Sequence, residues 1–201
     1  MGQALQGLQG IERFTVTQRI TPLVNRYDIR AVDADGEPGA LLATAQQKRL
    51  AFKEQVTFYA DEARTVPVFT FKARQRLDLA SGYDVLDADG APIGSFRKDF
   101  GRSLLRSTWH LEGDGLQATG SERNATVAVA RRVWNLVPVV GDLLAPFVVH
   151  FDFVERDGRA VLSSTRRVSA RDRYDVRVPG ARVDGRLAAA MAVALDALQG
   201  R

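Results

Sequence analysis

Short segments in which apolar and polar side chains alternate, separated by Asp-Gly pairs, constrain the fold of this chain more than any other feature. In Phe69–Leu77 the odd positions are mainly apolar, whereas the even positions carry Thr70, Lys72, Arg74 and Arg76. A strand places successive side chains on opposite faces. The pattern therefore predicts a strand with one buried face and one basic, solvated face.

Similar strand-like runs recur along the whole chain. They are Arg13–Gln18, Arg26–Val32, Gln55–Tyr59, Tyr83–Leu86, Ile93–Lys98, Leu105–Glu112, Leu116–Ser121, Val148–Val154, Ala160–Arg167 and Arg173–Val178. Asp-Gly pairs, which suit tight hairpins because both residues tolerate positive φ, begin at Asp35, Asp89, Asp114 and Asp157. We therefore expect an antiparallel sandwich or barrel that forms one domain over residues 1–201, with residues 1–10 as a flexible N-terminal segment.

The chain ends on an apolar segment, Leu187–Leu198, in which Asp196 is the one charged residue. As a helix, this segment would span about 18 Å, which is too short for a bilayer core of about 30 Å. Most of its positions are alanine. Its bulky residues form a stripe at helical spacing: Leu187, Met191, Leu195 and Leu198. Periodicity allows either an amphipathic helix lying on a sheet or a slim helix buried all round. Asp184 is the predicted N-cap and Gly200 the predicted stop.

A second apolar stretch, Val133–Phe153, contains Pro138 and Pro146, which exclude a transmembrane helix. We expect Val137–Pro146 to form a short helix or loop that caps one end of the barrel or docks on a membrane. Glu122–Trp134 fits either a helix or a strand, and of the two we favour a short helix.

The sequence offers little support for catalysis. It contains no cysteine, which excludes a disulfide framework, a thiolate zinc site and a cysteine nucleophile. The two histidines, His110 and His150, lie far apart, and no Gly-x-Ser-x-Gly elbow is present. Gly113–Ala118 matches a loose G-x-G-x-x-A, but a strand-like run follows it instead of the helix that a phosphate loop needs. We predict a protein that is not an enzyme and uses no cofactor and no metal.

Basic side chains are the strongest remaining signal for binding. The formal net charge of +4 favours phosphates or anionic lipid surfaces, whereas the scarcity of aromatic residues among the cations argues against nucleic acid. Arginine forks match phosphate oxygens. The candidate lipid- or anion-binding residues are Lys72, Arg74 and Arg76 on one predicted strand face, and Arg97, Lys98, Arg102 and Arg106 around the next hairpin.

The order of these segments resembles the tubby C-terminal-like superfamily, and within it the LURP-one-related proteins and the phospholipid scramblases. The likeness extends over about Arg13–Gln199 and includes YDIRAVDADGEPGALLATAQQKRLAFKEQVTFY, VPVFTFKARQRLDLASGYDVLDADGAPIGSFRKDFGRSLLRSTWHLE, FDFV, RDRYDVRV and the apolar tail. It rests on the YDV-x-DADG-x-x-I-G hairpin, a Trp on the following strand and the terminal helix. The resemblance implies a closed antiparallel barrel of about 12 strands with the C-terminal helix buried at its centre. A helix lined with alanine is thin enough for that position, and closure removes exposed sheet edges.

Tubby proteins bind phosphoinositide headgroups through basic residues on the barrel. The resemblance therefore implies a non-enzymatic module that associates with anionic phospholipid headgroups. The alternative is a structural or regulatory barrel that contacts a protein partner. We expect a cytoplasmic protein, peripheral at the inner face of the membrane, because no signal peptide and no transmembrane span is visible. The Ala-, Arg-, Asp- and Val-rich composition indicates a bacterial member.

Overall fold

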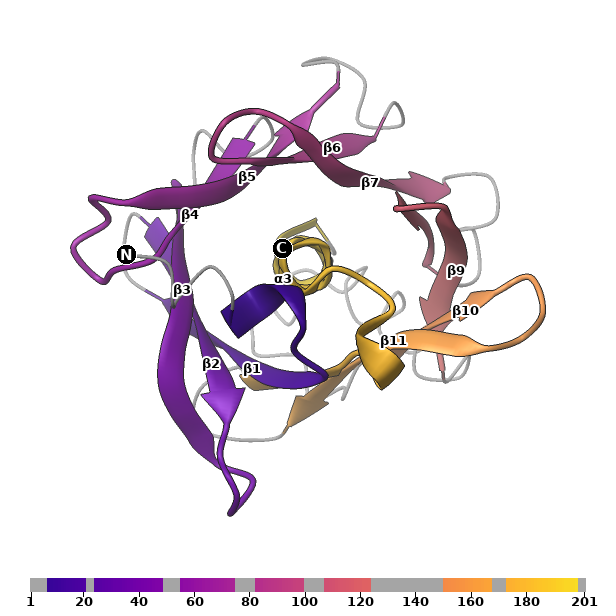
Figure 1. Cartoon of the computed structure of the whole chain (residues 1–201), viewed down its shortest axis with the longest axis horizontal. Coiled ribbons are helices and arrows are strands. Elements are labelled where there is room, and N and C mark those ends of the chain that lie inside the picture. The colour runs from indigo at the N-terminus through magenta and orange to yellow at the C-terminus, as the bar shows by residue number, and fades with distance from the viewer. Residues whose placement is uncertain are drawn as a thin grey trace, which may run out of the picture.

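Twelve antiparallel strands close into a barrel around one helix in the computed structural model of the chain (Figure 1). The structure describes residues 7–20, 24–48, 55–74, 82–99, 107–123, 150–167 and 173–198. The strands are β1 (Arg13–Ile20), β2 (Val24–Val32), β3 (Pro38–Lys48), β4 (Gln55–Tyr59), β5 (Pro67–Ala73), β6 (Tyr83–Asp87), β7 (Pro92–Asp99), β8 (Thr108–Gly113), β9 (Leu116–Glu122), β10 (His150–Glu155), β11 (Ala160–Arg167) and β12 (Arg173–Arg177). Each strand pairs with its neighbours in sequence, and β1 pairs with β12 to close the barrel. A 3₁₀ turn, η3 (Pro179–Ala181), leads into the helix α3 (Gly185–Leu198).

The alternation in the sequence corresponds to the inner and outer faces of the barrel wall. Along β9, Leu116, Ala118 and Gly120 are buried, whereas Gln117 and Thr119 are exposed. The β8–β9 connection has positive φ at both central residues, 48° at Asp114 and 74° at Gly115, as a two-residue hairpin turn requires. The predicted strand pattern and the Asp-Gly hairpin at this position are therefore confirmed.

The sequence reasoning missed β3, which is 11 residues long. Its residues 42–45 are all buried, so the segment lacks the alternation on which strand prediction depends. The β2–β3 pairing also shifts register between Ile29 and Arg30 and again between Arg30 and Val32. Such irregularities change which side chains face inward, and the alanine-rich composition of β3 adds little strand propensity.

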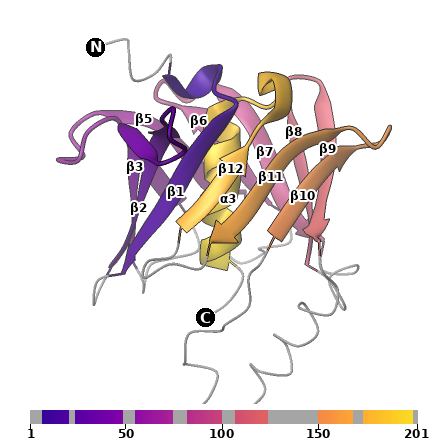
Figure 2. The same cartoon turned by 90° about the horizontal axis from the view of Figure 1, so that it is seen from below.

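Helix α3 runs through the middle of the barrel (Figures 1 and 2). Its residues 187–195 are at most 5% exposed, so the prediction of a helix buried all round is confirmed and the amphipathic alternative is wrong. Glycines on the wall make room for it: a Cβ on Gly94 would lie 2.7 Å from Cδ2 of Leu187, and one on Gly113 would lie 2.8 Å from it. Asp184 accepts a hydrogen bond from the backbone N–H of Arg186 at 2.8 Å, which confirms the predicted N-cap.

A buried polar cluster holds the C-terminal end of α3 to the wall. The carboxylate of Asp196 accepts hydrogen bonds from the Tyr27 hydroxyl, at 2.9 Å, and from the Tyr174 hydroxyl. The Gln18 amide donates to the Tyr27 hydroxyl oxygen at 3.3 Å. Burial raises the pKa of Tyr27, and the Asp196 charge raises it further, so this hydroxyl remains a donor. The cluster links the helix to β1, β2 and β12.

Several expectations fall at the borders of the described residues. The helix assigned to Glu122–Trp134 is wrong at its start, because Glu122 is the last residue of β9, where it pairs with Phe151 of β10. Residues 124–134 lie outside the described part, as do residues 137–146 and Gly200. The strand predicted over Phe69–Leu77 ends at Ala73.

Candidate functional site

Four aspartates on the outer wall bind arginines in the same way. Each aspartate follows an inward-facing aromatic residue, and its arginine comes from the end of the preceding strand or the residue just beyond it. The pairs are Arg19–Asp28 at 2.6 Å, Arg74–Asp84 at 2.7 Å, Arg123–Asp152 at 2.6 Å and Arg167–Asp175 at 2.6 Å. Arg74 is one of these four arginines, and its ion pair with Asp84 links the end of β5 to β6. The hydrogen bond with Asp84 raises the pKa of Arg74.

The structure separates the basic residues predicted from the sequence. Lys72 points outward from β5 and is exposed, opposite Asp84 of β6. Arg97 points outward from β7 and is exposed, opposite His110 of β8. Lys98 points inward, and its ammonium group lies 5.8 Å from the centre of the buried Trp109 ring. Lys72, Arg74 and Arg97 therefore share the outer face, whereas Lys98 belongs to the interior. Arg76, Arg102 and Arg106 lie outside the described residues.

Two of these cations are available to a ligand. Within the part of the chain that the structure describes, neither Lys72 nor Arg97 has a carboxylate within 4.0 Å. They lie on β5 and β7, separated by β6, so their backbones are about 10 Å apart across the sheet. They are also offset by two residues, about 7 Å along the strands, because Lys72 is level with Ser95. A single phosphate group, or two adjacent ones, fits between two long basic side chains at this spacing.

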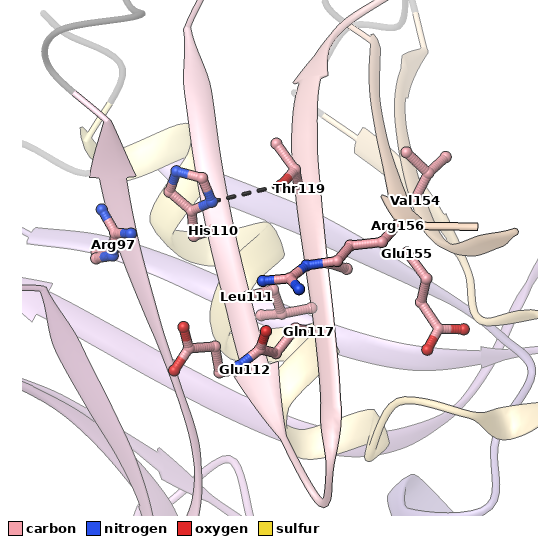
Figure 3. Close-up of a pocket in the computed structure, with 10 residues that line it drawn as sticks. Arg97, His110, Leu111, Glu112, Gln117, Thr119, Val154, Glu155 and Arg156 are labelled. Atoms are coloured by element: carbon pink, nitrogen blue, oxygen red, sulfur yellow. Dashed lines mark hydrogen bonds between the residues drawn. The ribbon is translucent and has the colours of Figure 1, made fainter. Parts of the chain in front are cut away.

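A shallow hollow of about 290 Å³ lies beside Arg97 on the outer wall (Figure 3). It spans β7, β8, β9 and β10 and is lined by Arg97, His110, Leu111, Glu112, Gln117, Ala118, Thr119, Val154, Glu155 and Arg156. Arg156 extends over the hollow, and it has no carboxylate partner among the described residues. Glu155 is bound by Arg182 at 3.1 Å, which offsets its charge. The hollow therefore presents two unpaired guanidinium groups, those of Arg97 and Arg156, beside Glu112.

His110 lies between an acid and a hydroxyl in this hollow. Its Nε2 is 3.2 Å from the Asp99 carboxylate, and its Nδ1 is 3.4 Å from the Thr119 hydroxyl. The order of groups is that of an acid–base–nucleophile chain, but the Thr119 contact is at the limit of a hydrogen bond. The flanking strands pair with each other through their backbone N–H groups, so these groups do not form an oxyanion hole. The arrangement suits anion binding better than catalysis.

The sequence reasoning did not find Arg156. Its position beside the Asp157-Gly158 pair placed it in a hairpin turn, but nothing in the sequence placed that hairpin beside β8 and β9. Among the described residues, no three His, Asp or Glu side chains gather as a metal site would require.

A closed barrel of twelve antiparallel strands around its own C-terminal helix defines a tubby-like barrel protein. The family model of the LURP-one-related proteins matches residues 41–196, so the chain belongs to this family, which is part of the tubby-like superfamily. The family is not known for enzymatic activity. The comparison with curated proteins found no match. No helix in the described part is long and apolar enough to cross a membrane.

Proposed function

We propose that this LURP-one-related barrel is a non-enzymatic module that binds anionic phosphate groups on the inner membrane surface through its outer wall. The observation that carries the proposal is a group of three outward cations that have no carboxylate partner in the described part and lie between β5 and the β10–β11 turn: Lys72, Arg97 and Arg156. We call this group the basic wall. Arg26 on β2 and Arg177 on β12 are also exposed without a carboxylate partner, but they lie across the barrel from this group. Arg74 is not included, because its guanidinium group is bound to Asp84. Arg76, Arg102 and Arg106, which the sequence also offers as candidates, lie outside the described residues and are not included.

The expected binding is electrostatic and weak. Each basic residue near an anionic bilayer contributes about 1 kcal/mol, and the attraction fades beyond a Debye length of about 8 Å at physiological salt. The basic wall would therefore contribute about 3 kcal/mol, a factor of about 150 in affinity, at low ionic strength. Binding of this size should fall steeply as salt is added.

Co-sedimentation of the full chain with vesicles tests the proposal. The protein should sediment with phosphatidylglycerol vesicles at low salt and should not sediment with pure phosphatidylcholine vesicles. A double variant, Arg97→Ser/Arg156→Ser, should lose about 30-fold in affinity for the anionic vesicles. The matched control is Arg26→Ser/Arg177→Ser, which removes the same charge from exposed positions on β2 and β12 and should bind as the wild type does.

Two outcomes would contradict the proposal. If the wild-type protein does not sediment with anionic vesicles at low salt, the hypothesis of lipid binding is wrong. A barrel that contacts a protein partner then becomes the better hypothesis. If the control pair weakens binding as much as the pair in the hollow, net charge is responsible and the basic wall is not the site. Val154, which is 38% exposed at the edge of the hollow, is the first residue to test for a protein contact.

A further inference from the structure

The hollow on the outer wall contains two rows of side chains with opposite chemistry. Arg97, His110 and Thr119 lie directly opposite one another on β7, β8 and β9 and form the first row. Glu112 and Gln117, directly opposite each other on β8 and β9, form the second row. The rows are two residues apart along the strands, about 7 Å. One side of the hollow therefore presents a guanidinium group, and the other side presents a carboxylate and an amide oxygen (Figure 3).

The charges in this hollow do not neutralise one another. Glu112 forms no ion pair within the described part of the chain, although the unpaired guanidinium groups of Arg97 and Arg156 line the same hollow. The charge of Glu112 also acts on Arg74 over a longer distance, but that guanidinium group is bound to Asp84. The four aspartates of the outer wall, in contrast, each bind an arginine. A ligand that complements the hollow therefore carries charges of both signs.

The two arginines and the acid are placed for the two ends of such a ligand. Arg97 and Arg156 reach the hollow from opposite sides, from β7 and from the β10–β11 turn (Figure 3). A phosphate between them accepts hydrogen bonds from both guanidinium groups. Glu155, the other acid of the hollow, is bound by Arg182 at 3.1 Å. Glu112 is therefore the acid left for a cationic group of the ligand.

We infer that this hollow binds the phosphoethanolamine headgroup of a phospholipid or of the corresponding free phosphodiester, an inference that rests on the proposed binding of phosphate groups by the basic wall. Arg97 and Arg156 hold the phosphate, and the ammonium group donates hydrogen bonds to the Glu112 carboxylate and the Gln117 amide oxygen. Four single bonds separate phosphorus from nitrogen, about 5 Å when extended, and the long side chains of both rows close the remaining gap. A hollow of about 290 Å³ suits a group of this size.

The same arrangement disfavours related ligands. A choline headgroup has no N–H, so it cannot donate a hydrogen bond to Glu112. A glycerol headgroup brings no positive charge, and a serine headgroup adds a carboxylate that Glu112 repels. A free amino acid separates its two charged groups by only two single bonds, which is too short to bridge the rows. The hollow therefore selects ethanolamine among the common phosphodiester headgroups.

Soluble headgroups test this selectivity on the full protein without a membrane. Glycerophosphoethanolamine and glycerophosphocholine have the same phosphodiester and the same net charge, and they differ only in the methyl groups on nitrogen. Each is titrated to about 10 mM, ten times a millimolar Kd, while the backbone amide signals of His110, Glu112 and Gln117 are followed in a ¹H–¹⁵N spectrum. The ethanolamine compound should bind about fivefold more tightly, the value of one exposed ion pair.

Variants show whether Glu112 is the source of the preference. Glu112→Gln, at an exposed position, should abolish the fivefold difference and leave the binding of glycerophosphocholine nearly unchanged. The matched control is Glu12→Gln, which removes the same charge from an exposed position before β1 and should keep the preference. The inference is overturned if the wild-type protein binds both compounds equally, if Glu112→Gln keeps the preference, or if Glu12→Gln loses it.

Vesicles distinguish a lipid headgroup from a free phosphodiester. Two vesicle preparations contain the same fraction of phosphatidylglycerol, and phosphatidylethanolamine makes up the rest of one and phosphatidylcholine the rest of the other. The wild-type protein should sediment more with the ethanolamine vesicles, and Glu112→Gln should sediment equally with both. If the protein sediments with neither but prefers soluble glycerophosphoethanolamine, the proposed membrane function fails and the inference holds for a free phosphodiester. If it sediments equally with both and shows no soluble preference, the proposed function stands and this inference fails.

Discussion

Replacing Asp196 by alanine tests how the barrel holds its central helix. The Asp196 carboxylate accepts hydrogen bonds from two tyrosine hydroxyls whose residues are 0% exposed (Tyr27) and 9% exposed (Tyr174). Each buried hydroxyl that loses its acceptor costs about 1–3 kcal/mol. The expected loss is therefore about 2–6 kcal/mol, against a typical domain stability of about 5–15 kcal/mol.

Urea unfolding followed by circular dichroism measures this loss as a lower midpoint at an unchanged slope. The same replacement is then made in a Tyr27→Phe/Tyr174→Phe background, where neither hydroxyl remains to be left without an acceptor. In that background Asp196→Ala should cost less than about 1 kcal/mol. If the replacement costs the same in both backgrounds, the two hydrogen bonds do not hold the helix and the reasoning is refuted.

Three further predictions concern the wall and the helix. Ala190→Asp, at a position 0% exposed, should abolish soluble folding, as should truncation before Gly185, whereas Ala88→Asp in an exposed turn should leave the melting temperature nearly unchanged. Gly120→Ala should lower the free energy of unfolding by about 1–3 kcal/mol, because the new methyl group would overlap the Phe153 ring. In a Phe153→Leu background the same replacement should cost less, and this account is wrong if the losses of the two single variants simply add up in the double variant. Burial raises the pKa of Tyr83 to about 12, so the stability that comes from keeping its hydroxyl protonated is fully present below pH 10 and is lost as the pH rises toward 12. Denaturant unfolding between about pH 10 and pH 12 should therefore show the free energy of unfolding fall by about 2–3 kcal/mol, and Tyr83→Phe should remove that fall. A fall of the same size in the Tyr83→Phe variant would show that Tyr83 is not its source.

Local patterns were sufficient for most of the strands. The predicted ranges Gln55–Tyr59 and Ala160–Arg167 coincide with β4 and β11. The period of two is a property of each strand alone, so it can be read without knowing what the strand packs against. The β3 strand was not predicted, because four consecutive residues of it, 42–45, are buried and its pairing with β2 shifts register. Buried and exposed positions therefore do not alternate along it.

The candidate site was predictable only in part. Alternation placed Lys72 and Arg74 on one face, but it did not show that Asp84 binds Arg74. Proximity along the chain grouped Lys98 with Arg97, whereas alternation within β7 sends them to opposite sides of the wall.

The sequence by itself determined the strand and turn pattern, the N-cap at Asp184 and a terminal helix too short to cross a bilayer. Full burial of that helix came from the family resemblance, since its periodicity also fitted a helix lying on a sheet. Only the tertiary structure decided that Asp196 binds Tyr27 and Tyr174, and that Arg156 lies over the same hollow as Arg97 and His110. The physical reason is that periodicity and capping depend on neighbours along the chain. Contacts across a closed barrel depend instead on the register of every strand pair between them, and no local pattern encodes that register.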